Sequence, residues 1–259
     1  MTTAPALATS TLDGGVREVD FTLTVGSSRV PCVVWLPFDS STRRTLVAFG
    51  HGGAQHKKSP EIRSRALRYA LQHGWVGLAI DAPDHGDRTT MERAEVQRTL
   101  TARRIRGDRT VPSLAPAQKI AFLDELAAQA VPEWQAAIDA VCTHVAPSIE
   151  RFGYWGISQG TWIGIPLLAA EPRFRCAVLG LAQLHPQHER LREAARRITV
   201  PVRFTIQWDD PIRDRGQSCS LFSTLGCPEK SLHIYPGGHA ETPAEEAAAW
   251  DAFFQRHLE

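Results

Sequence analysis

The segment RFGYWGISQGTWIG, residues 151–164, has the pattern of a short apolar strand that ends at a serine and continues as a helix. Gly156 and Gly160 stand two residues before and two residues after Ser158. In a Gly-x-Ser-x-Gly turn the serine hydroxyl projects above the sheet, and the glycines leave no side chains to crowd it. The turn also directs a helix N-terminus at the hydroxyl, so the amide of Gln159 becomes available to an oxyanion. The segment predicts a nucleophilic serine at the edge of a sheet.

The rest of the chain alternates between apolar runs and helical patterns, which is typical of an α/β domain with a mostly parallel sheet. Continuous apolar runs suit strands that are covered on both faces. Strands are predicted at residues 16–25, 29–37, 45–50, 74–81, 151–158, 174–182, 200–208 and 230–236, the first two forming a hairpin turned at residues 26–28. Helices are predicted at residues 59–74, 115–145, 159–170 and 242–259, with Pro132 as a kink or break. We expect one domain over residues 16–259, with a central sheet of about eight strands flanked by helices.

Composition and charge exclude several classes of protein. Of the 259 residues, 43% are hydrophobic and 22% are charged, and the formal net charge is +1. So small a charge creates no overall field that would attract nucleic acid or a membrane surface. No apolar run is long enough to span a bilayer, and residues 1–15 lack the features of a signal peptide. We expect residues 1–15 to be a disordered leader, and the partner to be a small molecule with no nucleic acid and no membrane.

The cysteines and histidines predict neither a disulfide framework nor a metal site. The five cysteines are Cys32, Cys142, Cys176, Cys219 and Cys227. Cys219 and Cys227 are close enough in sequence to consider a bridge, but no framework spacing supports it. The chain has no HExxH or paired CxxC spacing, and GHGG at residues 50–53 does not extend to the GxGxxG of a dinucleotide site. We expect a reduced cytoplasmic protein without a metal or an organic cofactor.

A serine hydroxyl needs a base and a stabilised oxyanion before it attacks a carbonyl group. His239 follows the last predicted strand in the Gly-rich segment HIYPGGHAETP, residues 233–243, which suits a loop at the carboxyl edge of the sheet. The carboxylate that orients the imidazole is expected after the preceding strand, in TIQWDDPI at residues 205–212. Asp210 is favoured because proline and an apolar residue follow it, and Asp209 is the alternative.

The order Ser158, Asp210, His239 is that of the α/β-hydrolases. From about Val16 to its end the chain resembles this superfamily, and within it the dienelactone-hydrolase-like and related small esterases. The segment AIDAPDHGDR, residues 79–88, resembles the loop after the fourth strand of that fold. Dienelactone hydrolases use a cysteine nucleophile, whereas Ser158 is a serine, which favours ordinary carboxylic esters as substrates.

The resemblance also implies which groups surround the nucleophile. FGHGGAQHKKSP, residues 49–60, looks like the oxyanion loop of the superfamily. The backbone amide of Gly53 or Ala54 would then join that of Gln159 as an oxyanion donor. The side chains expected in the substrate pocket are Trp162, Gln183, His185 and Trp208, with His51 of the oxyanion loop as a further candidate.

Residues 87–119 carry seven arginines and one lysine against four acids. One interpretation is a solvated surface helix. The other is a short lid whose Arg103, Arg104 and Arg106 bind an anionic part of the substrate. The stretch between Ala182 and Val200 leaves little room for a large cap, so this segment would shape access to the site.

These features support the hypothesis of a serine hydrolase that cleaves carboxylic esters, lactones or thioesters of a small molecule through an acyl-enzyme. An acyltransferase or a cyclising thioesterase with the same three residues is the alternative. A second alternative is a non-catalytic binding protein of the same fold. Such proteins usually lose a triad residue, whereas this chain retains all three.

Overall fold

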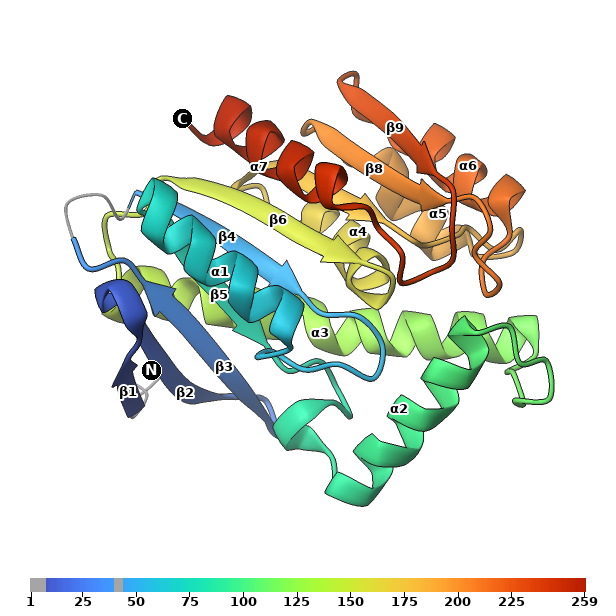
Figure 1. Ribbon diagram of the computed structural model, residues 1–259, viewed down its shortest axis with the longest axis horizontal. Helices are drawn as coiled ribbons and strands as arrows, with labels where there is room; N and C mark the ends of the chain where they lie inside the picture. The colour runs from blue at the N-terminus through green and yellow to red at the C-terminus, as the bar shows by residue number, and fades with distance from the viewer. Residues whose placement is uncertain (1–7, 40–43) are drawn as a thin grey trace.

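The computed structural model describes residues 8–39 and 44–259, and its strands form one nine-stranded sheet in the order β1-β2-β3-β5-β4-β6-β7-β8-β9 (Figure 1). The strands are β1 (Ala8–Thr11), β2 (Arg17–Val25), β3 (Ser28–Leu36), β4 (Thr45–Gly50), β5 (Val76–Ile80), β6 (Arg151–Ile157), β7 (Phe174–Gly180), β8 (Val202–Gln207) and β9 (Lys230–Tyr235). The first three strands and the β3–β5 pair are antiparallel, and the pairs from β5 to β9 are parallel. The carboxyl ends of the parallel strands therefore meet at one edge of the sheet.

Helices cover both faces of this sheet. The α-helices are α1 (Pro60–His73), α2 (Met91–Ile105), α3 (Pro116–His144), α4 (Gln159–Ala170), α5 (Glu189–Arg196), α6 (Arg215–Thr224) and α7 (Ala244–Leu258), and the 3-10 turns are η1 (Asp13–Gly15) and η3 (Gly86–Arg88). In Figure 1, α1 and α7 cross one face while α3 and α4 lie on the other. No helix in the described part of the chain has both the length and the apolar character needed to cross a membrane.

Successive side chains of each strand pack into two separate cores, because they point to opposite faces of the sheet. Trp35 and Phe49 belong to the core beneath α1 and α7. Val34 and Ala48, their neighbours in the chain, belong to the larger core beneath α3 and α4. All four are fully buried, which explains why these strands have continuous apolar runs.

Most predicted elements are confirmed, and β4 and α4 match their predicted limits. The hairpin between β2 and β3 turns at residues 26 and 27, as expected. Helix α3 continues through Pro132 to His144, so no break occurs there. All five cysteines are free thiols, and the possible bridge between Cys219 and Cys227 is not formed.

Two expectations about the N-terminal part need correction. Residues 8–15 are not a disordered leader, because β1 pairs with residues 17–20 of β2 and makes nine strands where we expected about eight. The reversal between β1 and β2 depends on Gly14 and Gly15, whose φ values of 73° and 78° suit glycine. The remainder of the predicted leader, residues 1–7, lies outside the described residues.

Candidate active site

Ser158 occupies a strained turn between β6 and α4. Its backbone angles, φ of 58° and ψ of −117°, lie in a region that residues other than glycine rarely adopt. A Cβ on Gly160 would lie 2.4 Å from the Gly50 carbonyl oxygen, and one on Gly156 would lie 2.7 Å from the Tyr154 hydroxyl. Both contacts are too short for real atoms. Gly160 therefore lets the turn approach β4, and Gly156 leaves room for the Tyr154 side chain beneath the turn.

The loops after β8 and β9 bring an acid and a base to this serine. His239 Nε2 lies 3.0 Å from Ser158 Oγ, and His239 Nδ1 lies 2.5 Å from Asp210 Oδ2. The other oxygen of Asp210 accepts from the Ile212 amide at 2.9 Å. Asp209 is exposed, and its carboxylate faces the Gly237 amide instead. Of the two candidate acids, the structure brings Asp210 to the histidine.

Burial and neighbouring charges tune His239. Desolvation lowers the pKa of this imidazole below 6.5, and the hydrogen bond to Asp210 acts in the opposite direction. The positive charge of Arg213 also lowers this pKa. A lowered pKa keeps the imidazole neutral at neutral pH, with Nδ1–H donating to Asp210 and Nε2 free to accept a proton from Ser158.

The loop after β4 places unpaired amides opposite the start of α4. Gly53 and Ala54 line the same cavity as Gln159, and a Cβ on Gly53 would lie 3.4 Å from Gln159 Oε1. Among the described residues, the amides of Gly53 and Ala54 have no backbone hydrogen-bond partner. The Gln159 amide, first in its helix, has no intrahelical partner. These are the groups that the sequence predicted as oxyanion donors.

His51 supports the loop after β4 and does not line the cavity, which corrects its assignment to the pocket. Its Nε2 accepts from the Ala82 amide at 3.0 Å, so its Nδ1 carries the proton and donates to the Gly52 carbonyl at 2.8 Å. Asp81 fixes the far end of the loop by accepting from the amide and the Nζ of Lys57, both at 2.8 Å.

A cavity of about 1030 Å³ contains Ser158 and His239 in its wall. Two of the expected side chains, Trp162 and His185, line it. Gln183 does not, because its amide group is used to accept from the Asp214 amide and to donate to Gln217, both at 2.8 Å.

Trp208 also does not line the cavity, although it was expected there. It is 50% exposed, and the Arg215 guanidinium stacks 4.1 Å from its ring. Trp208 is the first residue after β8, and its side chain belongs to the outer surface.

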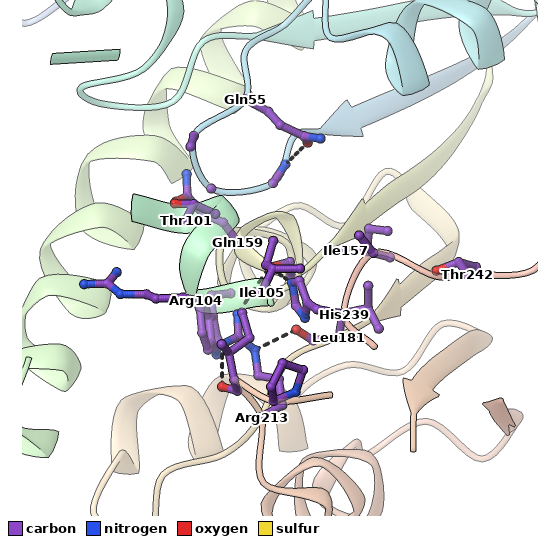
Figure 2. A pocket seen from close by; sticks show the side chains of 18 of the residues that line it. Gln55, Thr101, Arg104, Ile105, Ile157, Gln159, Leu181, Arg213, His239 and Thr242 are labelled. Atoms are coloured by element: carbon purple, nitrogen blue, oxygen red, sulfur yellow. Dashed lines mark hydrogen bonds between the residues drawn. The ribbon is translucent and has the colours of Figure 1, made fainter. Parts of the chain in front are cut away.

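The segment of residues 87–119 forms a wall of the cavity through part of α2 and the loop to α3. Figure 2 shows Thr101, Arg104 and Ile105 of α2 at the cavity that also holds Gln159, His239 and Arg213. The segment is therefore more than a solvated surface helix.

The arginines predicted to bind an anion are placed differently from expectation. Arg103 pairs with Asp108 at 2.8 Å, and Arg106 is exposed and outside the cavity wall. Arg104 lines the cavity but donates to the Pro112 carbonyl and extends away from His239 (Figure 2). None of the three reaches Ser158 through a described contact.

Comparisons with known proteins show the family to which the chain belongs. A cold-adapted esterase from an Arctic intertidal metagenomic library is 30% identical, with 97% of each chain covered and a TM-score of 0.79. The chain belongs to the α/β-hydrolase superfamily. Two less similar α/β-hydrolase structures share its fold. A dienelactone hydrolase from Anabaena variabilis is 20% identical, with 99% of this chain and 100% of that chain covered and a TM-score of 0.62. An acetyl xylan esterase from Paenibacillus sp. R4 is 16% identical, with 98% of this chain and 89% of that chain covered and a TM-score of 0.68. No family model and no curated protein sequence matches the chain.

Two residues of this α/β-hydrolase site were missed by sequence reasoning. Arg213, three residues after Asp210, donates from Nη2 to Ser158 Oγ at 3.2 Å. Lys119, in the first turn of α3, lines the same cavity and lies 5.3 Å from the Trp162 ring. Arg213 had no motif to signal it, and Lys119 was counted with the arginine-rich segment without a separate role.

Proposed function

We propose that this α/β-hydrolase is a serine hydrolase that cleaves carboxylic esters, or the related lactones and thioesters, of a small molecule. The observation that carries the proposal is the chain of contacts from Ser158 Oγ to His239 Nε2 (3.0 Å) and from His239 Nδ1 to Asp210 (2.5 Å). The esterases among its structural neighbours support ester hydrolysis as the reaction.

In the first half of the reaction, Ser158 Oγ attacks the ester carbonyl while its proton passes to His239 Nε2. The charge that develops on the carbonyl oxygen is stabilised by the amides of Gln159 and of Gly53 or Ala54. When the tetrahedral intermediate collapses, the bond to the alcohol oxygen breaks. The alcohol leaves with the proton from His239, and the acyl group stays on the serine.

In the second half, water takes the place of the alcohol. His239 accepts a proton from the water, whose oxygen attacks the acyl carbonyl in the same oxyanion site. The bond to Ser158 Oγ then breaks, the serine regains its proton from His239, and the carboxylic acid departs. Asp210 holds the imidazole in one tautomer and stabilises the imidazolium that forms twice in each cycle.

Hydrolysis of p-nitrophenyl esters from acetate to laurate tests the proposal. Ser158→Ala is expected to lower kcat by at least about 10⁴-fold on every ester that the wild type cleaves. Ser64→Ala is the matched control because Ser64 is exposed on α1, and it should keep wild-type kinetics. Covalent labelling by a fluorophosphonate, mapped by mass spectrometry, should modify Ser158 in the wild type. Activity that survives Ser158→Ala would reject this serine as the nucleophile.

A further inference from the structure

Arg213 brings a fixed positive charge to the nucleophile. Besides its bond to Ser158 Oγ at 3.2 Å, its Nε donates to the Leu181 carbonyl at 2.9 Å. Its Nη1 donates to the Ile212 carbonyl, also at 2.9 Å. A guanidinium has five N–H donors, so these three bonds leave two, one on each terminal nitrogen. Arg213 is held in place by the protein and can still donate to a ligand.

Lys119 places a second cation beside the first. The Arg213 Cζ lies 4.5 Å and the Lys119 Nζ lies 5.3 Å from the centroid of the same ring, that of Trp162. The Trp162 indole is fixed by its Nε1 bond to the Gln183 carbonyl at 3.2 Å. Two cations from distant parts of the chain therefore share one aromatic wall of the cavity.

Within the described part of the chain, neither of these cations has an acidic partner within ion-pair distance. Other cations near the core do, since Lys57 pairs with Asp81, Arg88 with Glu133, and Arg203 with Glu246. Lys119 and Arg213 are half-buried, and charged groups that are shielded from water are normally paired. Beyond ion-pair distance, the Asp210 carboxylate raises the pKa of Arg213, whereas the charges that act on Lys119, those of Arg213 and Arg104, are both positive.

Burial and neighbouring positive charges lower the pKa values of the basic groups in the cavity. Desolvation, with the charges of Arg213 and Arg104, lowers the pKa of Lys119 to about 8. Desolvation also lowers the pKa of Arg213 to about 10. Nearby, desolvation and the charge of Lys119 lower the pKa of His185 to about 4, so its imidazole is neutral. His185 Nε2 is buried and has no hydrogen-bond partner among the described residues.

We propose that Arg213 and Lys119 form a subsite for a carboxylate carried by the substrate, which makes half-esters of dicarboxylic acids, or esters of similar chemistry, the preferred substrate class. This proposal rests on the proposed function and specifies its substrate. The two free N–H groups of Arg213 suit the two oxygens of a carboxylate. The neutral His185 offers a further polar group at the same wall.

The position of Arg213 also limits the length of the substrate. Its guanidinium contacts Ser158 Oγ directly, and the ester carbonyl must lie against the same oxygen during attack. A carboxylate bound at Arg213 is therefore separated from the ester carbonyl by a short spacer. Half-esters of succinate and glutarate should be cleaved better than the half-ester of a long-chain diacid such as sebacate.

Monophenyl glutarate and methyl phenyl glutarate test the subsite, because they differ only in the free carboxylate. Phenol release is followed by chromatography and corrected for spontaneous hydrolysis. The wild type should prefer the half-ester in kcat/KM, and Lys119→Met should reduce that preference at least tenfold, mainly through KM. Lys119→Arg should restore most of it. Arg106→Met removes an exposed arginine from the same segment and should leave the preference unchanged.

Failures of the two proposals are distinguishable. A wild type that cleaves both esters through Ser158 but shows no preference, or a Lys119→Met that slows both equally, overturns the subsite and leaves the hydrolase intact. If neither ester is cleaved, calorimetric binding of glutarate to wild type and Lys119→Met still decides the subsite, because binding that is absent or unaffected by the substitution contradicts it. Stronger competition by inorganic phosphate than by glutarate would overturn the carboxylate assignment.

Discussion

The Arg213 guanidinium donates a hydrogen bond to Ser158 Oγ at 3.2 Å, and the same oxygen lies 3.0 Å from His239 Nε2. A guanidinium can only donate, so it occupies a lone pair of the hydroxyl and cannot receive its proton. The hydroxyl proton is therefore directed to His239. In the proposed reaction, Arg213 thus orients the serine for proton transfer and also lowers the pKa of His239, the base that would receive the proton.

Arg213→Met should move the acid limb of the pH profile. In the wild type the pKa of His239 lies below 6.5, so kcat/KM for a neutral ester should fall only as the pH drops below that value. The positive charge of Arg213 disfavours the imidazolium, so its removal raises the pKa of His239 and moves the limb to higher pH. Initial rates on p-nitrophenyl acetate between pH 4.5 and pH 8 give the position of the limb.

Arg215→Met is the control for this experiment. Arg215 lies two residues away, stacks on the exposed Trp208, and has no described contact with Ser158 or His239. Its substitution should leave the limb where it is. A limb that stays in place in Arg213→Met, or that moves equally in both variants, would show that Arg213 does not act on the base.

Asp210→Asn and Asp209→Asn separate the two acids that the sequence left open. Asp210 orients the imidazole through the 2.5 Å contact, and its replacement should lower kcat by about 10⁴-fold because the tautomer of His239 is no longer held. Asp209 is exposed, and the hydrogen bonds that the described residues make with it come from the loop backbone at Gly237. Its replacement should change kcat by a few-fold at most. Similar losses in both variants, with native circular dichroism, would contradict the assignment.

Glu246→Ala should destabilise the protein strongly. This carboxylate is fully buried at the start of α7 and accepts hydrogen bonds from β8, β9 and α7, from the side chains of Arg203, Thr205, Tyr235 and Trp250. Truncation leaves Arg203 without its partner, and breaking a buried pair costs about 3–5 kcal/mol. Urea denaturation measures the free energy of unfolding. Glu245→Ala, an exposed neighbour, should change it by less than about 0.5 kcal/mol.

The elements of the fold that the sequence revealed are those whose burial dictates a repeating pattern. A run such as TLVAFG, residues 45–50, is covered on both faces, so its composition identifies it as a strand. Strand β1 could not be found in this way, because ATST at residues 8–11 is exposed throughout and is held by pairing with β2. Helix α5 has eight residues and lies in a stretch that we expected to be too short to hold a cap.

The site was predictable where chain order dictates geometry. Ser158, Asp210 and His239 each follow a parallel strand, so they had to meet at the same edge of the sheet. Which way a side chain points after a strand ends depends on loop conformation, and for this reason Trp208 was wrongly assigned to the pocket. Arg213 was missed for the same reason, since its position is set by carbonyl groups of two different loops.

The preference for a carboxylate should weaken as the pH rises through 8. Lys119 is protonated in the free enzyme below its lowered pKa of about 8 and loses its charge above it. Arg213 and Arg104 face Lys119 from the loop after β8 and from α2, and His185 faces it from the loop after β7. The pKa of Arg213 is about 10, whereas that of His185 is about 4, so neither of these two groups titrates near pH 8.

The ratio of kcat/KM for monophenyl glutarate to that for methyl phenyl glutarate should therefore decline between pH 7 and pH 9 in the wild type and stay flat in Lys119→Met. A ratio that is equally flat in the wild type would show that the charge of Lys119 does not bind the carboxylate.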